Sequence, residues 1–235
     1  QVSADFFKYN ITDQVGTIPI NTLFSTLCYD DTTQAYASNP FCAQIQRDPT
    51  GTNGGAVVGG VTQVILVSQN VASVKVEGWD YSASYGFHTE DLFGKDYGDI
   101  AARLDATWMY QYTLQGLPKQ AYTQFANTIT NATPEWKANA SVRWSYDKYS
   151  ISWSTQYIGS MIANQAQQAG VIDPYKTGDY FKHDLRVTYK YSDAITFRGG
   201  VLNVFDKYPP YLPETFTGTG TGSSQYDNRG RYFFI

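Results

Sequence analysis

Apolar and polar residues alternate most strictly between positions 137 and 158. From Lys137 to Tyr146 every even position is apolar or aromatic and every odd position is polar. After a break at Asp147 and Lys148 the alternation resumes and continues to Ile158. A period of two over about ten residues is the pattern of a β-strand, whose successive side chains point to opposite faces. This stretch therefore predicts a hairpin of two antiparallel strands.

The same period recurs along the rest of the chain. The predicted strands, eight in all, are 2–11, 61–87, 100–114, 137–146, 149–158, 181–191, 195–205 and 226–235. The connections between them alternate, long at 12–60, 115–133, 160–179 and 207–225 and short at 88–99, 147–148 and 192–194. Outer-membrane barrels have short turns at one end and long loops at the other, whereas a soluble β-sandwich has no reason to sort its loops by length. The pattern predicts an all-β fold, an antiparallel transmembrane β-barrel segment of about eight strands.

Each predicted strand has an aromatic-rich apolar face and a polar face. In a sandwich the apolar face would pack in a core, whereas in a membrane barrel it would meet lipid and the polar face would line the lumen. Charges of opposite sign on the polar face, such as Arg103 with Asp105 and Asp184 with Arg186, suit a watery lumen better than a small packed core. The residues expected to face lipid are Val142, Trp144, Ile151, Trp153, Val187 and Tyr189. The residues expected to face the lumen are Arg143, Ser152, Arg186 and Lys190.

The composition favours the same fold class. The 235 residues include 20 Tyr, 13 Phe and 5 Trp, while only 16% are charged. Aromatic girdles at the two membrane interfaces of a barrel would explain this large number of aromatic residues. No apolar run approaches the roughly 18 residues that a transmembrane helix needs. The net charge of −4 offers no basic surface, so nucleic acid is not an expected partner.

Two cysteines, Cys28 and Cys42, lie in the first long connection. We expect them to form a disulfide, because such a pair suits an oxidising compartment such as the periplasm or the cell surface. Two free thiols are the alternative. A metal site is not expected, because no histidine lies near the cysteines and the CxxC spacing is absent.

The sequence offers little catalytic chemistry. His88 and His183 are its only histidines. His88 is expected to lie in a short turn, in water. His183 precedes Asp184, but neighbours on a strand point to opposite faces, so the two are poorly placed as a dyad. No P-loop, GxSxG or HExxH motif occurs, and the chain is not expected to be an enzyme.

Four segments resemble the barrel of TonB-dependent outer-membrane receptors. Leu202–Pro210 (LNVFDKYPP) resembles the family's N-L-F-D-K-x-P-P segment, and Tyr226–Ile235 (YDNRGRYFFI) resembles its closing Y-D-x-x-G-R-x-F strand. Glu77–Asp80 (EGWD) is similar to the segment that opens an earlier strand, and Thr133–Lys137 (TPEWK) is similar to the entry to another. The four segments follow the family's order from about residue 61 to the end.

The resemblance implies a bacterial outer-membrane receptor. Such a receptor binds a scarce nutrient, for example a ferric siderophore, cobalamin or a glycan, and takes it up with energy from TonB. The implied partners are outer-membrane lipid, the extracellular ligand, and TonB through an N-terminal segment that this chain lacks; no cofactor is implied. Family members carry an N-terminal plug and a barrel of about 22 strands. We therefore expect this chain to be the C-terminal third of such a barrel, with no plug and cut at both ends.

Ligand contacts are expected from aromatic residues of the long loops, which could stack on sugars or aromatic chelates. The alternative is that these residues pack the loops together. The candidates are Tyr29, Tyr36, Phe41, Tyr122, Phe125, Tyr175, Tyr211 and Phe216.

Two other functions remain open. The chain could be a small self-contained barrel that anchors or adheres, in which case Val2–Ile11 should pair with Tyr226–Ile235. It could also belong to a passive porin, which needs an open lumen and no plug.

Overall fold

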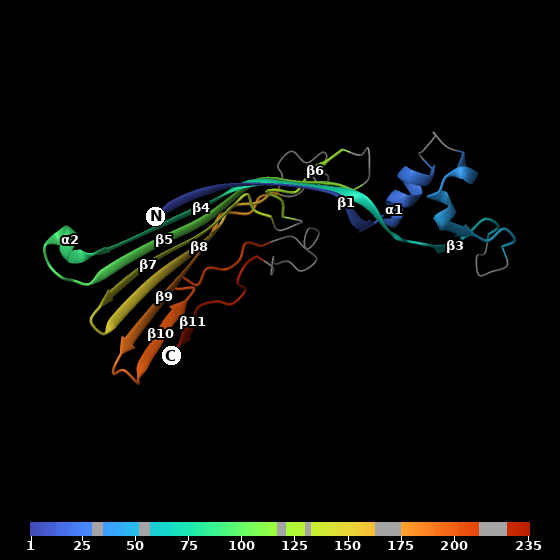
Figure 1. Cartoon of the computed structure of the whole chain (residues 1–235). Coiled ribbons are helices and arrows are strands. Elements are labelled where there is room, and N and C mark those ends of the chain that lie inside the picture. Colours follow the sequence, from blue (N-terminus) through green and yellow to red (C-terminus); the bar gives the residue numbers. More distant parts are fainter. Residues whose placement is uncertain (30–34, 52–56, 117–120, 130–132, 163–174, 212–224) are drawn as a thin grey trace. The chain divides into compact units, whose positions relative to one another are not determined.

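The computed structural model describes the chain except for residues 30–34, 52–56, 117–120, 130–132, 163–174 and 212–224. It is mostly β-structure with a few short helices (Figure 1). None of the helices in the described ranges is long and apolar enough to cross a membrane. The strands are β1 Val2–Thr17, β2 Ile45–Arg47, β3 Val61–Val64, β4 Ser68–His88, β5 Asp99–Gln115, β6 Thr123–Gln124, β7 Trp136–Tyr146, β8 Tyr149–Ile158, β9 Tyr180–Lys190, β10 Thr196–Leu202 and β11 Tyr232–Phe234. The helices are α1 Ile20–Thr22, the π-helix η1 Leu23–Tyr29, the 3-10 helices η2 Tyr36–Ser38 and η3 Cys42–Gln44, and α2 Thr89–Phe93.

The chain divides into two compact units. The first, here called the sheet unit, comprises Gln1–Tyr9, Lys75–Thr113 and Thr123–Ile235. The second, here called the loop unit, comprises Asn10–Val74 and Leu114–Tyr122. The division falls within β1, β4 and β5, so these three strands contribute residues to both units.

The long strands form one sheet in the order β1-β4-β5-β7-β8-β9-β10-β11, and the short β6 pairs with β5 (Figure 1). Neighbours from β5 to β11 are antiparallel. The eight predicted strands therefore form, each beside its neighbour in the sequence. The hairpin predicted from the strict alternation between residues 137 and 158 is β7–β8, whose register joins Lys137 to Ile158 and Tyr146 to Tyr149.

This sheet does not close on itself. β1 and β11 stand at opposite ends of the strand order, and no pairing joins them within the described residues. The expected pairing for a small self-contained barrel is therefore not formed. An open antiparallel sheet with two free edges is the arrangement expected of a segment of a larger barrel, because closure is what removes edges.

Several predicted strand boundaries were wrong. β1 runs to Thr17 rather than ending at residue 11, and the connection that follows holds short helices and the β2–β3 hairpin. The strand predicted over 61–87 is divided, because Val61–Val64 form β3, which pairs with β2, and the long strand β4 begins only at Ser68. β10 ends at Leu202 because Asn203 takes a left-handed backbone conformation, with φ at 53°. β11 covers only Tyr232–Phe234, because the preceding residues bond to side chains rather than to a neighbouring strand. The connection after His88, predicted as a polar turn, contains helix α2.

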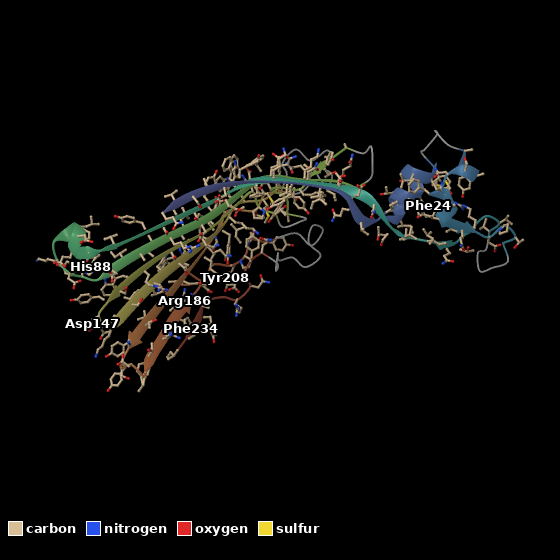
Figure 2. All side chains as sticks on the ribbon, in the orientation of Figure 1. Phe24, His88, Asp147, Arg186, Tyr208 and Phe234 are labelled. Atoms are coloured by element: carbon tan, nitrogen blue, oxygen red, sulfur yellow. A yellow bond between two sulfur atoms is a disulfide. The ribbon has the colours of Figure 1, made fainter. Side chains whose placement is uncertain are left out.

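The register confirms which predicted residues share a face. Val142 lies opposite Trp153 and Trp144 opposite Ile151, and Ile151 in turn lies opposite Val187. We call this side of the sheet the apolar face. It includes Phe6 in β1 and the alternate residues Trp79, Tyr81 and Tyr85 in β4, because the ring of Tyr81 stacks on that of Trp136 in β7 and the ring of Trp79 contacts that of Phe6. The other side, the polar face, includes Arg143, Ser152 and Arg186 in one cross-strand row, together with Lys190 in β9. Figure 2 shows the side chains on the strands, with Arg186 labelled.

Aromatic rings gather in two belts on the apolar face. The first belt runs through Phe6, Trp79, Tyr81, Trp136, Trp108 and Tyr110, with 5.2 to 6.4 Å between successive ring centroids. The second belt comprises Trp144, Tyr146, Tyr149, Tyr189, Tyr191 and Phe197. On β7 the belts are separated by the length from Trp136 to Tyr146. At about 3.4 Å per residue and a tilt of about 40° this length spans roughly 25 Å, the height of the apolar band of an outer-membrane barrel.

A small hydrophobic core lies on the polar face, next to the longer connections. Ile158 and Tyr180 are cross-strand partners that are almost completely buried. Ile129, Met161 and Tyr226 complete the cluster from three connecting segments. This packing fixes the described parts of the connections onto β8 and β9.

Candidate ligand-contact site

The segment between β1 and β4 folds around its own small core. Ile18, Leu23 and Ile45 are buried there with Cys28 and Cys42, which form a disulfide with 4.9 Å between their Cα atoms. The disulfide prediction is therefore confirmed. We call this part of the loop unit, the described residues from Ile18 to Val64, the disulfide lobe.

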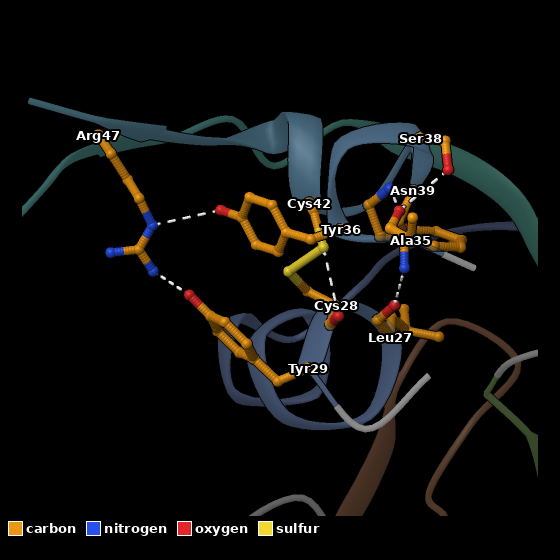
Figure 3. The surroundings of a disulfide bond; sticks show 10 residues. Leu27, Cys28, Tyr29, Ala35, Tyr36, Ser38, Asn39, Cys42 and Arg47 are labelled. Carbon is orange, nitrogen blue, oxygen red and sulfur yellow. Dashed lines mark hydrogen bonds between the residues drawn. A yellow bond between two sulfur atoms is a disulfide. The ribbon is translucent and has the colours of Figure 1, made fainter. Parts of the chain in front are cut away.

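A buried asparagine adds a second link across the lobe (Figure 3). The side-chain amide of Asn39 donates to the carbonyl oxygen of Leu27 at 2.7 Å, and its Oδ1 accepts from the backbone N–H of Phe41 at 2.9 Å. Asn39 is only 2% exposed. The disulfide and Asn39 thus both connect the two halves of the lobe.

An arginine joins two exposed tyrosines on this support (Figure 3). The guanidinium of Arg47 donates from Nε to the hydroxyl of Tyr36 at 3.3 Å and from Nη2 to the hydroxyl of Tyr29. Its Nη1 donates to the carbonyl oxygen of Gly59 at 2.6 Å. The rings of Tyr29 and Tyr36 stack with 6.0 Å between centroids, and Phe24 stacks on Tyr29 at 6.3 Å. We call Phe24, Tyr29, Tyr36 and Arg47 the aromatic–arginine cluster.

The cluster is accessible and charged. Tyr29 is 49% exposed and Tyr36 is 47% exposed. The hydrogen bond to Tyr36 is the main cause of a raised pKa for Arg47, so this arginine keeps its positive charge at every physiological pH. Exposed ring faces beside a guanidinium can hold a ligand that combines planar groups with negative oxygens.

The other predicted ligand residues have different surroundings. Phe41 is half-buried against the core of the lobe, which is the packing role given as the alternative. Tyr122 is 40% exposed in the loop unit. Phe125 contacts the ring of Tyr112 at 6.0 Å. Phe216 lies outside the described residues.

Two further candidates contact each other in the sheet unit. The hydroxyl of Tyr175 donates to the carbonyl oxygen of Tyr211, and Tyr175 also packs against the hydrophobic core at Tyr180. Tyr211 is 68% exposed. The structure thus brings together Tyr29 with Tyr36 and, separately, Tyr175 with Tyr211.

Sequence reasoning missed Arg47 and Phe24. Arg47 is 18 residues from Tyr29 and comes close only because β2 pairs with β3 and the disulfide closes the segment between them. One feature of the sequence could have pointed to Arg47, because it is the only basic residue between positions 9 and 74.

The two histidines are structural in different ways. The ring of His183 contacts the rings of Trp153 and Phe205, with 5.4 and 5.2 Å between centroids, so His183 packs among aromatic side chains. His88 ends β4 and contacts the carboxylates of Asp96 and Asp99 at 3.3 and 3.0 Å. The prediction that His88 lies in water was incomplete, because its ring also contacts these two carboxylates.

An open antiparallel sheet with aromatic belts on one face and charges on the other defines a segment of an outer-membrane β-barrel. The family model for the TonB dependent receptor-like β-barrel matches residues 1–204. The chain therefore belongs to the TonB-dependent receptor β-barrel family and to the bacterial outer membrane. The match includes the disulfide lobe and ends before the DKYPP and closing-strand segments.

Solved structures share this fold. A ferric enterobactin receptor variant from Pseudomonas aeruginosa has 16% identity and a TM-score of 0.57, with 99% of this chain and 27% of that chain covered. The siderophore receptor PirA from Acinetobacter baumannii has 18% identity and a TM-score of 0.55, with 99% and 28% covered. The FrpB iron transporter from Neisseria meningitidis has 14% identity and a TM-score of 0.54, with 99% and 29% covered. This chain thus spans between a quarter and a third of the length of these proteins.

Proposed function

We propose that the chain is the C-terminal part of a receptor barrel that takes up a ferric siderophore with energy from TonB. The plug domain, the segment that meets TonB and the remaining strands would belong to parts of the receptor outside this sequence. The aromatic–arginine cluster carries the proposal, because it places half-exposed rings and a fixed positive charge on a disulfide-held lobe. The family membership and the iron receptors among its structural neighbours support it.

The chemistry of the cluster suits this class of ligand. Ring faces bind planar groups by stacking, and a guanidinium binds anionic oxygens through charge-assisted hydrogen bonds. Ferric chelates with aromatic or carboxylate arms offer both. The resemblance to the receptor family also implies cobalamin and glycans as alternative ligands. The experiment below distinguishes a ferric siderophore from these two.

The first test measures binding at the cell surface. Cells that express the complete receptor would receive iron-55 as a ferric siderophore at low temperature, and labelled cobalamin and a labelled oligosaccharide would be tested in parallel. Replacing both Tyr29 and Tyr36 by Ala should weaken siderophore binding about tenfold or more, at about 0.5–1.5 kcal/mol for each ring contact. Tyr85→Ala, at an exposed tyrosine of the apolar face, is the matched control and should leave binding unchanged.

The second test separates active uptake from a passive porin. An uncoupler should abolish uptake and leave surface binding intact, because binding precedes the energised step. Uptake that ignores the uncoupler and rises linearly with concentration would support the porin instead. Energised uptake of cobalamin or the oligosaccharide, without uptake of the siderophore, would show that the ligand of the receptor belongs to that class instead.

A further inference from the structure

Two residues of opposite charge lie on the apolar face of the sheet unit, beside the first aromatic belt. Lys8 in β1 contacts Glu77 in β4, with 2.7 Å between Nζ and Oε1. The hydroxyl of Tyr110 in β5 donates to the other carboxylate oxygen of Glu77 at 3.1 Å. Lys8 and Glu77 share this face with Phe6 and Trp79, which lie two positions away on the same strands and belong to the belt. We call Lys8, Glu77 and Tyr110 the polar triad.

The polar triad lies at the level of the lipid headgroups. Between the two belts, the apolar face of the described strands contains no Asp, Glu, Lys or Arg. A charge that faces lipid is costly in the hydrocarbon and is tolerated near the membrane interface. The first belt lies toward the long connections, and these are extracellular in outer-membrane barrels. The triad therefore meets the headgroups of the outer leaflet.

The triad offers hydrogen-bond donors and acceptors side by side. The side chain of Lys8 is 62% exposed, whereas that of Glu77 is 17% exposed. The ammonium group of a lysine has three N–H donors, and the contact with Glu77 uses one of them. The hydroxyl oxygen of Tyr110 donates to Glu77 and keeps its lone pairs as acceptors. Such a group suits a ligand that has both hydroxyl groups and anionic oxygens, as a phosphorylated sugar has.

Aromatic rings lie beside the triad. The ring of Phe6 contacts that of Trp79 at 5.2 Å between centroids, and Phe6 is 49% exposed. The ring of Trp108 stacks on that of Trp136 at 5.5 Å, and its indole N–H donates to Oε1 of Glu135 at 2.7 Å, which fixes its orientation. Ring faces next to hydrogen-bonding groups can hold a sugar ring by stacking.

An apolar groove lies deeper on the same face. Its volume is about 410 Å³, and residues that line it include Val2 in β1, Ala83 in β4, Leu104 in β5 and Ala140 in β7. Ala83 is six residues from Glu77, which corresponds to about 20 Å along the strand and about 15 Å of depth at a tilt of about 40°. One leaflet of hydrocarbon is also about 15 Å thick, half of a core of roughly 30 Å. A lipid whose headgroup contacts the triad therefore has its acyl chains at the depth of the groove.

We propose that the outward side of the barrel binds one glycolipid of the outer leaflet. Its phosphorylated sugar headgroup contacts the polar triad and the rings beside it, and an acyl chain lies in the groove. The groove is continuous with the lipid-facing surface between the belts, so lipid is its occupant. A barrel keeps its apolar face toward lipid when it closes, and a plug occupies the lumen on the other side, so the site stays accessible in a complete receptor. This inference depends on the membrane location and not on which nutrient the receptor transports.

The first test compares two lipids on the purified complete receptor without substitutions. Native mass spectrometry would count the lipid molecules retained during titration with lipid A, which contains a phosphorylated glucosamine disaccharide, and with phosphatidylglycerol, which is anionic but has no sugar. We expect one tightly held lipid A molecule and binding of phosphatidylglycerol that is about tenfold weaker, because the sugar contacts are lost. Equal affinity for the two lipids would overturn the proposal. This comparison does not depend on the assembly of any variant.

The second test removes the charges of the triad. Lys8→Ala with Glu77→Ala deletes both charges without changing the net charge and should weaken lipid A binding about tenfold. Lys190→Ala with Asp193→Ala is the matched control, because it deletes an ion pair of 3.1 Å in the turn between β9 and β10 and should leave binding unchanged. Unchanged binding in the triad variant, or an equal loss in the control, would overturn the proposal.

The third test fills the groove. Ala83→Leu with Ala140→Leu adds apolar side chains that lipid tolerates, and it should weaken lipid A binding severalfold because the acyl chain loses its place. Val187→Phe adds a larger apolar side chain on the same face but outside the groove, and it should leave binding unchanged. Electrophoretic mobility without heating would identify the variants that assemble, and only these would be compared. Lipid A binding that is the same in the filled-groove variant and the unsubstituted receptor would overturn the assignment of the groove.

Discussion

The carboxylate of Asp206 accepts a hydrogen bond from the backbone N–H of Arg231, with 2.8 Å between Oδ1 and N. These two residues are 25 positions apart and belong to the two C-terminal segments that resemble the receptor family. Asn203 makes a second connection, because its side-chain amide donates to the carbonyl oxygens of Lys207 at 3.0 Å and Arg229 at 3.4 Å. The two segments therefore act as one structural element that positions the last strand of the sheet.

Asn203 should be costly to replace. It is 1% exposed, and its Oδ1 also accepts the backbone N–H of Lys207 at 2.8 Å. Asn203→Ala leaves buried backbone groups without partners and should lower the free energy of unfolding by about 2–3 kcal/mol. Asn228→Ala, an exposed asparagine in the same connection, is the control and should change it by less than about 0.5 kcal/mol. Urea titration of the complete receptor, followed by electrophoretic mobility, measures both; equal midpoints would contradict the role of Asn203.

The strands were predictable because successive side chains of a strand point to opposite faces, so a strand with one apolar and one polar face alternates between apolar and polar residues in the sequence. The pairing of β7 with β8 follows from the alternation around Asp147, which takes the positive φ of 48° that a tight turn needs. The disulfide was predictable because the chain has only two cysteines. These features depend on residues that are near in sequence or unique in type.

The missed features depend on contacts between distant segments. Local pattern extended the last strand back to residue 226, but the carboxylate of Asp206 and the amide of Asn203 hold those residues away from the sheet. The glycine of the closing segment, Gly230, also depends on this contact, because a Cβ at this position would lie 2.8 Å from Oδ1 of Asp206. The sequence shows the glycine and the aspartate but not that they meet. Arg47 was missed in the same way.

Asp227 should make the closing segment sensitive to acid. Burial by itself would raise the pKa of this carboxyl, but hydrogen bonds from the backbone of Arg229 and the side chains of Lys182 and Arg229 outweigh it, and the net pKa is lowered. A carboxyl with a lowered folded-state pKa stabilises the fold above its unfolded pKa of about 4, and that contribution is lost as the pH falls through the folded pKa. The protection factor for hydrogen exchange at the Arg229 amide, which donates to Asp227, should therefore be high at pH 7 and should fall as the pH is lowered below about 4.

The matching substitution is Asp227→Asn, which should remove the pH dependence of the protection factor and lower that factor at pH 7. Lys182 contacts Asp227 at 3.1 Å, and both side chains are at most 20% exposed. Asp193→Asn is the control, because Asp193 pairs with Lys190 at the same distance but is fully exposed; pairs of this kind contribute little. A protection factor that is the same in Asp227→Asn and in the unsubstituted receptor at both pH values would show that the ion pair does not hold the segment.

The two faces of the sheet should differ in their tolerance of charge. Val187 is on the apolar face, and the adjacent Thr188 is on the polar face opposite Arg198. Val187→Arg places a charge in the lipid band and should destabilise the barrel by about 2–4 kcal/mol. Thr188→Glu introduces a charged side chain one position away, on the polar face and opposite the positive charge of Arg198, and should have little effect. Folding into lipid vesicles, followed by tryptophan fluorescence during urea titration, compares the two, and similar stabilities would mean that the faces were assigned the wrong way round.

The disulfide should matter for ligand binding and hardly at all for assembly of the barrel. Cys28 precedes Tyr29 directly, and Cys42 follows Tyr36 after one short helix, so the bond fixes the two tyrosines relative to each other. A closed loop of this size constrains the unfolded chain by about 3 kcal/mol. Replacing both cysteines by serine should therefore loosen the lobe. The long antiparallel ladders from β5 to β10 contain neither cysteine and should be unaffected.

Substitution of Arg47 distinguishes the role of the disulfide from that of the aromatic–arginine cluster, which the disulfide supports. Arg47→Lys keeps the charge but cannot reach Tyr29, Tyr36 and Gly59 together, because lysine has one nitrogen where the guanidinium has three. It should weaken siderophore binding severalfold while the disulfide still forms, as mass spectrometry of a non-reduced digest would verify. Arg47→Lys should add little further loss in the variant that lacks both cysteines, because loosening the lobe already separates the tyrosines. Fully additive losses would mean that the disulfide and the arginine act on the ligand independently, and the cluster would not be a single binding unit.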